Sequence, residues 1–341
     1  MMRKLIAVIV VLLSIGLLVF SFAELQSIRD ALRQSDLVLL AGAFLLEILC
    51  LFNTATTFGA LYRLAGLRES RAQLFLMATA ANFVNMIAPS GGVGGIAVFL
   101  DGARRRGLPS ARVVVVGILY VMYEYAALIC VMVPGFFVLI RQENLNVGEV
   151  IAAGLLLGTA LALGTMLLLG YRSAAQLGRL LAWASRLANR SFRPFLHRDL
   201  LDADRAHRFS LEVAEGISSI RANPRNLIWP LLFTLNNKAL LLCVLAFAFL
   251  ALNTPFTVGT LVGGFSISYL FFYASPTPSG VGFVEGIMPA ALSAFGVPFT
   301  QAVLITLAFR GITVWFPLAV GAAAFRALQR QPALAAGDLQ G

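Results

Sequence analysis

Long apolar runs constrain this chain more than any other feature of its sequence. Seven stretches of about 18 or more residues are almost wholly apolar: 5–22, 37–61, 111–140, 150–169, 227–252, 256–274 and 300–325. As helices rising about 1.5 Å per residue, they are long enough to span a hydrocarbon core of about 30 Å. The alternating segments of about ten residues that mark a transmembrane barrel do not occur. We therefore predict an all-α, polytopic transmembrane helical bundle.

The composition agrees with a membrane location. Hydrophobic residues make up 59% of the chain and charged residues only 12%, about half the share usual in soluble proteins. In a membrane protein, the net charge of +10 reflects the excess of Lys and Arg in inner loops and contact with anionic lipids, so we predict no nucleic-acid partner. The cysteines Cys50, Cys130 and Cys243 lie in apolar runs without CxxC spacing, which predicts neither a disulfide framework nor a metal site.

Two glycine- and proline-rich stretches break apolar segments. They read PSGGVGG at 89–95 and PTPSGVG at 276–282. In a helix interior glycine costs about 1 kcal/mol and proline about 3 kcal/mol relative to alanine. Inside a bilayer, irregular backbone is tolerated only where it is buried in protein or lines a water-filled cavity. We therefore predict that each break is the tip of a helical hairpin within the membrane.

The distribution of arginines predicts the orientation of these hairpins. If 72–88 crossed the bilayer, Arg104–Arg106 and the segment 171–225, with ten arginines against five acids, would lie outside. That would violate the positive-inside rule. A hairpin at 72–107 that enters from inside, and one at 256–296 that enters from outside, place these arginines and both termini inside.

The sequence thus predicts a single integral membrane domain. The predicted order is helix 5–22, helix 37–62, re-entrant hairpin 72–107, helix 109–140, helix 149–170, a cytoplasmic basic amphipathic segment 171–225, helix 226–252, re-entrant hairpin 256–296 and helix 299–325.

An internal repeat with an offset of 189 residues relates the two hairpins. Pro89, Ser90, Gly91, Gly107 and Pro109 recur as Pro278, Ser279, Gly280, Gly296 and Pro298. The same shift places 37–62 on 226–252 and 109–140 on 299–325. We call these units copy one and copy two, and the charge argument gives them opposite orientations. Inverted repeats with paired helix breaks indicate the binding site of a transporter. The alternative is a coincidence between two glycine- and proline-rich turns.

Four ionisable residues lie near the middle of predicted helices. Copy one carries the acids Glu47 and Glu124, and copy two carries the bases Lys238 and Arg310. A charge at the bilayer centre costs about 2.5–3.5 kcal/mol on insertion scales, so it usually has a partner or a function. One hypothesis is two ion pairs between the copies. A second, compatible hypothesis is a polar site for a charged or zwitterionic headgroup.

The residues that follow the breaks extend this candidate site. Glu285 lies within reach of Arg310, and a planar guanidinium suits a phosphate, so we expect Arg310 to contact a lipid phosphate. Helix N-termini after the breaks also favour anions. The candidate substrate-binding residues are Arg310, Glu285, Lys238, Glu47, Glu124, Pro89, Ser90, Gly91, Pro278, Ser279, Gly280 and Asn85. There is no Walker sequence, HExxH motif or Ser/His/Asp set, so we expect no enzymatic activity, no catalytic residue, no cofactor and no metal.

Two motifs resemble a known family. GLPSA at 107–111, and PTPSGVGFVEG followed by GVP and Arg310, resemble the lysylphosphatidylglycerol synthase transmembrane (flippase-like) family over about residues 5–325. Glu285 and Arg310 belong to the more specific of these motifs, whereas Gly95 and Ile96 stand where related sequences often carry a glutamate. The resemblance implies a multi-pass protein of a prokaryotic inner membrane that moves or handles lipids. The sequence shows no aminoacyltransferase domain, so we expect no synthase activity.

The favoured hypothesis is a lipid flippase or transporter that moves a polar or charged-headgroup lipid between leaflets without ATP hydrolysis. Its partners would be membrane lipids with anionic or zwitterionic headgroups, and a homo-oligomer is possible. The alternative is a non-transporting accessory subunit of a lipid-modifying or envelope-biogenesis system.

Overall fold

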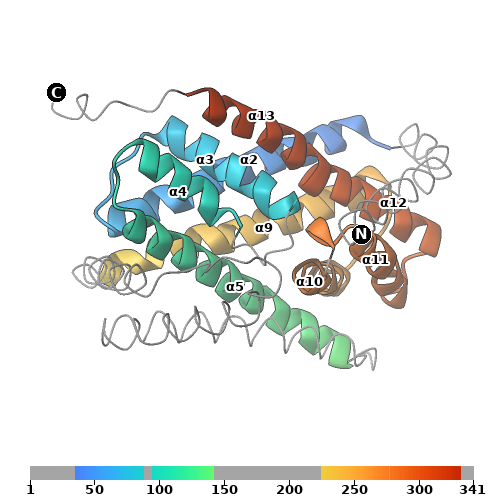
Figure 1. Ribbon diagram of the computed structural model, residues 1–341. Coiled ribbons are helices and arrows are strands. Elements are labelled where there is room, and N and C mark those ends of the chain that lie inside the picture. The colour runs from blue at the N-terminus through green and yellow to red at the C-terminus, as the bar shows by residue number, and fades with distance from the viewer. Residues whose placement is uncertain (1–34, 88–93, 142–223, 276, 332–341) are drawn as a thin grey trace, which may run out of the picture.

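The computed structural model describes residues 35–87, 94–141, 224–275 and 277–331 (Figure 1). Every regular element within these ranges is a helix, which confirms the predicted all-α fold class. The helices are α2 (Leu37–Leu64), α3 (Arg71–Ile87), α4 (Ile96–Arg105), α5 (Ser110–Arg141), α9 (Ile228–Ala251), α10 (Val258–Ala274), α11 (Phe283–Ala294), α12 (Phe299–Arg310) and α13 (Phe316–Arg330). Two 3-10 turns, η1 (Pro224–Leu227) and η2 (Pro278–Gly280), and a π-helical turn, η3 (Gly311–Trp315), complete them.

Parts of the predicted topology lie outside the described residues. These are helix 5–22, helix 149–170, nearly all of the basic segment 171–225, and the tripeptide Pro89, Ser90 and Gly91.

Among the described residues, four helical segments are long and apolar enough to cross a membrane. They are Leu37–Leu64, Ser110–Gly135, Arg225–Ala251 and Phe299–Arg330. Large apolar side chains are exposed along them, among them Leu45, Phe52, Val133 and Trp229. Large apolar side chains favour hydrocarbon over water, so their exposure suits contact with lipid.

The helices that flank the breaks are shorter. α3 and α10 have 17 residues each, α4 has 10 and α11 has 12. At about 1.5 Å per residue none exceeds about 26 Å, which is less than a hydrocarbon core of about 30 Å. α3 packs on α4, and α10 packs on α11. These lengths and contacts suit two helical hairpins, while their re-entrant position in a bilayer stays a prediction.

The two copies interlock through their long helices. α2 and α9 form the most extensive contact in the described structure. There, Asn53 donates a hydrogen bond of 2.7 Å to the carbonyl of Phe233, and Asn236 donates one of 3.2 Å to Asn53. On either side, α13 packs on α3 and α5 packs on α10 (Figure 1).

The contacts themselves follow the 189-residue repeat. The shift carries α2 onto α9, α3 onto α10, α4 onto α11, and α5 onto the segment from α12 to α13. Under this shift α3 corresponds to α10, and α13 corresponds to part of α5. The contact between α13 and α3 is therefore the counterpart of the contact between α5 and α10. This correspondence supports the hypothesis of a repeat, and the opposite orientation of its copies stays a prediction.

Both hairpins end in the same type of turn. Gly107 follows α4 with φ +65°, and Gly296 follows α11 with φ +85°, a region that glycine enters without steric cost. In each turn the amide after the glycine donates to a carbonyl five residues earlier, at 2.9 and 3.2 Å. This is the Schellman arrangement, and the next residue, Pro109 or Pro298, cannot continue the helix.

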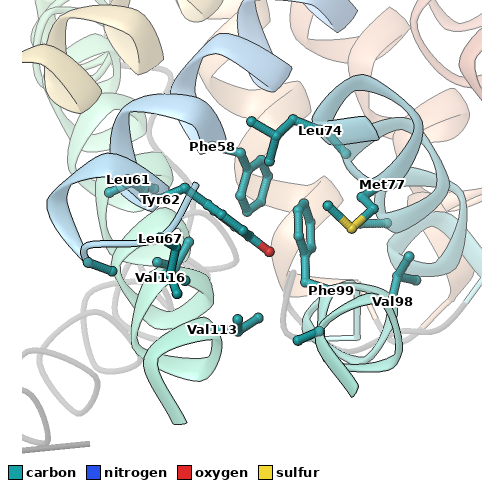
Figure 2. Packing of buried hydrophobic residues seen from close by; sticks show 14 of the residues in the cluster. Phe58, Leu61, Tyr62, Leu67, Leu74, Met77, Val98, Phe99, Val113 and Val116 are labelled. Carbon is teal, nitrogen blue, oxygen red and sulfur yellow. The ribbon is translucent and has the colours of Figure 1, made fainter. Parts of the chain in front are cut away.

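The buried apolar residues form two main cores, and each is centred on one copy. In copy one, Phe58 of α2 stacks on Phe99 of α4 with ring centroids 4.1 Å apart, and Leu74 and Met77 of α3 lie beside them (Figure 2). The core of copy two joins α9, α10, α11 and α12 with the first half of α2. Side chains that belong in neither core gather between the two.

Candidate functional site

A polar cavity lies where the two copies meet. It has a volume of about 200 Å³ and is lined by α2, α3, α5, α9, α10, η2, α12 and η3. Six of the candidate residues line it: Glu47, Asn85, Glu124, Lys238, Ser279 and Arg310. The sequence pattern therefore identified residues that are far apart in the chain and share one cavity.

One ion pair joins the two copies across this cavity. Lys238 Nζ on α9 lies 2.5 Å from Glu124 Oε2 on α5, and the side chains are only 2% and 10% exposed. The ammonium also lies 5.4 Å from the ring centroid of Tyr269, within the range of a cation–π contact. The hypothesis of an ion pair between the copies holds for these two residues.

The second ion pair lies entirely within copy two. Arg310 Nε donates to Glu285 Oε1 at 2.7 Å, and Arg310 Nη2 donates to the Ser279 carbonyl at 2.7 Å. Glu285 Oε2 in turn accepts from the Gly282 amide at 2.8 Å, which caps the N-terminus of α11. The hypothesis that both bases pair with acids of copy one is therefore wrong for Arg310. Its guanidinium holds the second break together, and its contact with a lipid phosphate stays a prediction.

The second break has an unusual backbone. Ser279, Gly280 and Gly282 have φ of +53°, +66° and +84°. A Cβ on Gly280 would lie 2.8 Å from Val284 Cγ2 and 3.2 Å from Phe272 Cα, so a larger residue does not fit. A non-glycine residue persists in this region only where its surroundings hold it, and Ser279 has such support on both its side chain and its carbonyl.

Ser279 also connects the two hairpins. Its hydroxyl donates a buried hydrogen bond of 2.7 Å to the carbonyl of Met86, in the last turn of α3. Carbonyls in the last turn of a helix lack partners within that helix, so this bond satisfies one of them. The break of copy two thus docks on the end of the helix that leads into the break of copy one.

The first break is held by an amide side chain. Asn85 Oδ1 on α3 accepts from the Gly95 amide at 2.5 Å, directly before α4 begins. A Cβ on Gly95 would lie 2.7 Å from Asn85 Nδ2 and 3.0 Å from the Ala81 carbonyl, so this approach requires glycine. Asn85 is therefore a helix cap as well as part of the cavity wall.

Glu47 differs from the other acids of the site. Its side chain lines the cavity, and the residue is only 4% exposed. Glu47 Oε2 has no hydrogen-bond partner, and Glu47 takes part in no ion pair within the described ranges. The hypothesis of two ion pairs between the copies therefore leaves this acid without its expected base.

The π-helical turn beside Arg310 is a feature that sequence reasoning missed. We predicted one helix over 299–325, whereas η3 interrupts it directly after Arg310. Thr313 of this turn lines the cavity. π-helical turns inside α-helices occur frequently at functional sites. Pro317 offered a signal, because it has no N–H to donate to the Thr313 carbonyl of a regular helix.

Neither the acids nor the cysteines form a metal site in the part of the chain that the structure describes. No group of three or more His, Cys, Asp or Glu residues gathers there. Cys50, Cys130 and Cys243 are free thiols.

Comparison with known protein families shows to which family this chain belongs. The family described as the lysylphosphatidylglycerol synthase TM region matches residues 5–321. The chain belongs to this family. Together with the four long apolar helices, membership makes it a multi-pass membrane protein. The match includes both breaks and the residues of the cavity, so the resemblance seen in the sequence motifs is confirmed. No curated protein and no solved structure matches the chain.

Proposed function

We propose that this member of the lysylphosphatidylglycerol synthase TM-region family is a lipid flippase or transporter. It moves a lipid with a polar or charged headgroup between leaflets without ATP hydrolysis. The observation that carries the proposal is the charged cavity between two apolar cores. Ionisable residues at such a position are costly and usually mark a substrate pathway. Packing alone does not require them, because apolar residues of similar volume often serve a buried site as well or better.

The two breaks support the same proposal. The cavity wall includes Asn85 beside the first break and Ser279 at the second, and Ser279 bonds to the end of α3. Broken helices that meet at a polar site are the usual construction of a transporter's binding site. In this proposal the headgroup passes through the cavity while the acyl chains stay in the bilayer.

The proposal extends to location and chemistry. In this proposal the protein lies in a prokaryotic cytoplasmic membrane, as its family resemblance implies, and the bias of arginines favours an orientation with both termini inside. Its partners are membrane lipids with anionic or zwitterionic headgroups. We treat the chain as a carrier without catalysis, because its sequence contains no Walker sequence, HExxH motif or Ser/His/Asp set.

Reconstitution tests this function. Purified full-length chain is placed in liposomes that contain trace lipids with fluorescent headgroups, and an impermeant quencher reports the fraction that reaches the outer leaflet. We expect at least one headgroup class to cross faster than in protein-free liposomes. The double variant Glu124→Gln, Lys238→Met removes the polar pair without leaving an unpaired charge, so we expect it to fold and to transport slowly. If no headgroup in a broad panel moves faster, the accessory-subunit alternative is favoured.

A further inference from the structure

Glu47 is the one acid of the cavity without a cation beside it in the described structure. Both bases that line the cavity are engaged, Lys238 by Glu124 and Arg310 by Glu285. The residue belongs to the buried face of α2, where Ala43 is fully buried and Cys50 is 4% exposed. With Glu47 ionised, the two ion pairs and Glu47 would carry one uncompensated negative charge.

Every ionisable group around Glu47 bears on its protonation. The others that line the cavity are Cys50 on α2 itself, Tyr120, Glu124 and Tyr125 on α5, Lys238 on α9, Tyr269 and Tyr273 on α10, and Arg310 on α12. The parts of α3 and η3 that reach the cavity contribute amides, a hydroxyl and apolar groups, but no ionisable side chain. At neutral pH thiols and tyrosines are normally uncharged, so none of these groups supplies a further cation.

A bound proton resolves this imbalance. An isolated ionised carboxylate in an apolar interior is costly, and buried groups in that position usually become neutral instead. A protonated carboxyl has no net charge. Its hydroxyl also donates, so it can use acceptors in the cavity that a carboxylate cannot. With that proton bound, Glu47 and the two ion pairs together carry no net charge.

We propose that Glu47 is a proton-binding site and that lipid movement through the cavity is coupled to proton binding and release there. This coupling rests on the proposed lipid transport, whereas the proton site does not. When the cavity opens to water on one side, the carboxyl releases its proton to water. It takes up a proton again before the cavity closes, because closure around the anion would bury an unpaired charge.

Infrared difference spectroscopy tests the proton site without any transport. The full chain in phospholipid nanodiscs is examined at neutral pH for the carbonyl stretch of a protonated carboxyl group, identified by its shift in D₂O. We expect the band to be lost in Glu47→Gln and to shift in Glu47→Asp, which retains a carboxyl. Asp101→Asn removes an exposed carboxylate on α4 and should leave the band unchanged. A wild-type spectrum without the band, or a band that survives Glu47→Gln, overturns the proposal.

A pH gradient tests the coupling. In liposomes with a gradient of one pH unit, coupling of one proton to one lipid supports up to about a tenfold asymmetry of labelled lipid between leaflets. We expect the gradient to drive asymmetry with the wild-type chain and not with Glu47→Gln. Transport that ignores the gradient in the wild type overturns the coupling and leaves the proposed transport standing. If the Glu47 band is present and no lipid moves, the proton site stands and the proposed transport function fails.

Discussion

At both helix breaks, the backbone amide directly before the returning helix needs a hydrogen-bond acceptor, and the two breaks supply different ones. In copy one, the amide that begins the returning helix bonds to a neutral side chain, Asn85, on the preceding helix. In copy two, the amide of Gly282, which directly precedes α11, bonds to Glu285, and Glu285 is itself bound by Arg310.

The repeat shows where this difference arises. With the offset of 189 residues, the counterparts of Glu285 and Arg310 in copy one are Ile96 and Val121. The charge-assisted hydrogen bonds that join Arg310, Glu285 and the Gly282 amide, here called the brace, are therefore present in copy two only. Hydrogen bonds to charged groups are roughly twice as strong as neutral ones, but loss of either partner leaves the other, a buried Arg310 or a partly buried Glu285, as an unpaired charge. We conclude that the second break is the more firmly held and also the more easily destroyed by a single substitution.

The largest expected effect concerns the sides of the membrane that the two hairpins face. Arg105 at the end of α4 and Ala294 at the end of α11 are counterparts in the repeat. Opposite orientation predicts that Arg105→Cys and Ala294→Cys react with a membrane-impermeant maleimide from opposite sides. Cys50, Cys130 and Cys243 are replaced by alanine in the background, since two of them are exposed. Labelling of both sites from one side would refute the inverted repeat.

The next largest effect concerns the brace of copy two. Arg310→Leu leaves the partly buried Glu285 without its cation and the Ser279 carbonyl without its donor. We expect a loss of about 3–4 kcal/mol of unfolding free energy in an SDS titration in mixed micelles. The double variant Arg310→Leu, Glu285→Gln should recover most of that loss. Arg105→Leu breaks an exposed pair with Asp101 and serves as control, with an expected loss below about 1 kcal/mol.

Transport by the same double variant separates two roles of Arg310. Recovery of both stability and transport would show that the arginine is structural. Recovery of stability alone is what we expect if the guanidinium also contacts a lipid phosphate, and Arg310→Lys should then fail as well, because lysine lacks the planar fork.

A smaller effect concerns the backbone of the second break. Gly280→Ala places a Cβ 2.8 Å from Val284 at a positive φ, so strain and overpacking should together cost about 2–4 kcal/mol. Gly296→Ala and Gly107→Ala are matched controls with positive φ and no atom within 4 Å, and each should cost about 1–2 kcal/mol. Equal losses at all three positions in thermal unfolding would show that the tip is less tightly packed than the structure indicates.

The smallest effect concerns the neutral cap of copy one. Asn85→Ala removes the acceptor of the Gly95 amide and should cost about 1 kcal/mol, as at other helix N-caps. A loss as large as that of Arg310→Leu, measured in the same titration, would contradict the difference between the two breaks.

Much of the architecture follows from the sequence because its causes are local. The apolar runs around 37–64 and 228–251 have few ways to avoid helix formation in a membrane, and the structure places α2 and α9 there. The second break is equally local, since Pro278 and the adjoining glycines disfavour a continuous helix. The turn at η3 was missed because a single proline after a run of apolar residues also fits an uninterrupted helix.

The sequence by itself determined that this chain lies in a membrane, where its helices break, and which side chains are too costly to face lipid. These are local costs that nearby residues set, so they can be read from composition and spacing. Only the tertiary structure decided the partners. Lys238 meets Glu124 from a helix 114 residues away, Arg310 pairs with Glu285, which already lay within its reach in the sequence, and Glu47 has no cation beside it among the described residues. That outcome depends on how the helices cross and rotate against one another, because an ion pair forms only where two side chains converge within a few ångströms.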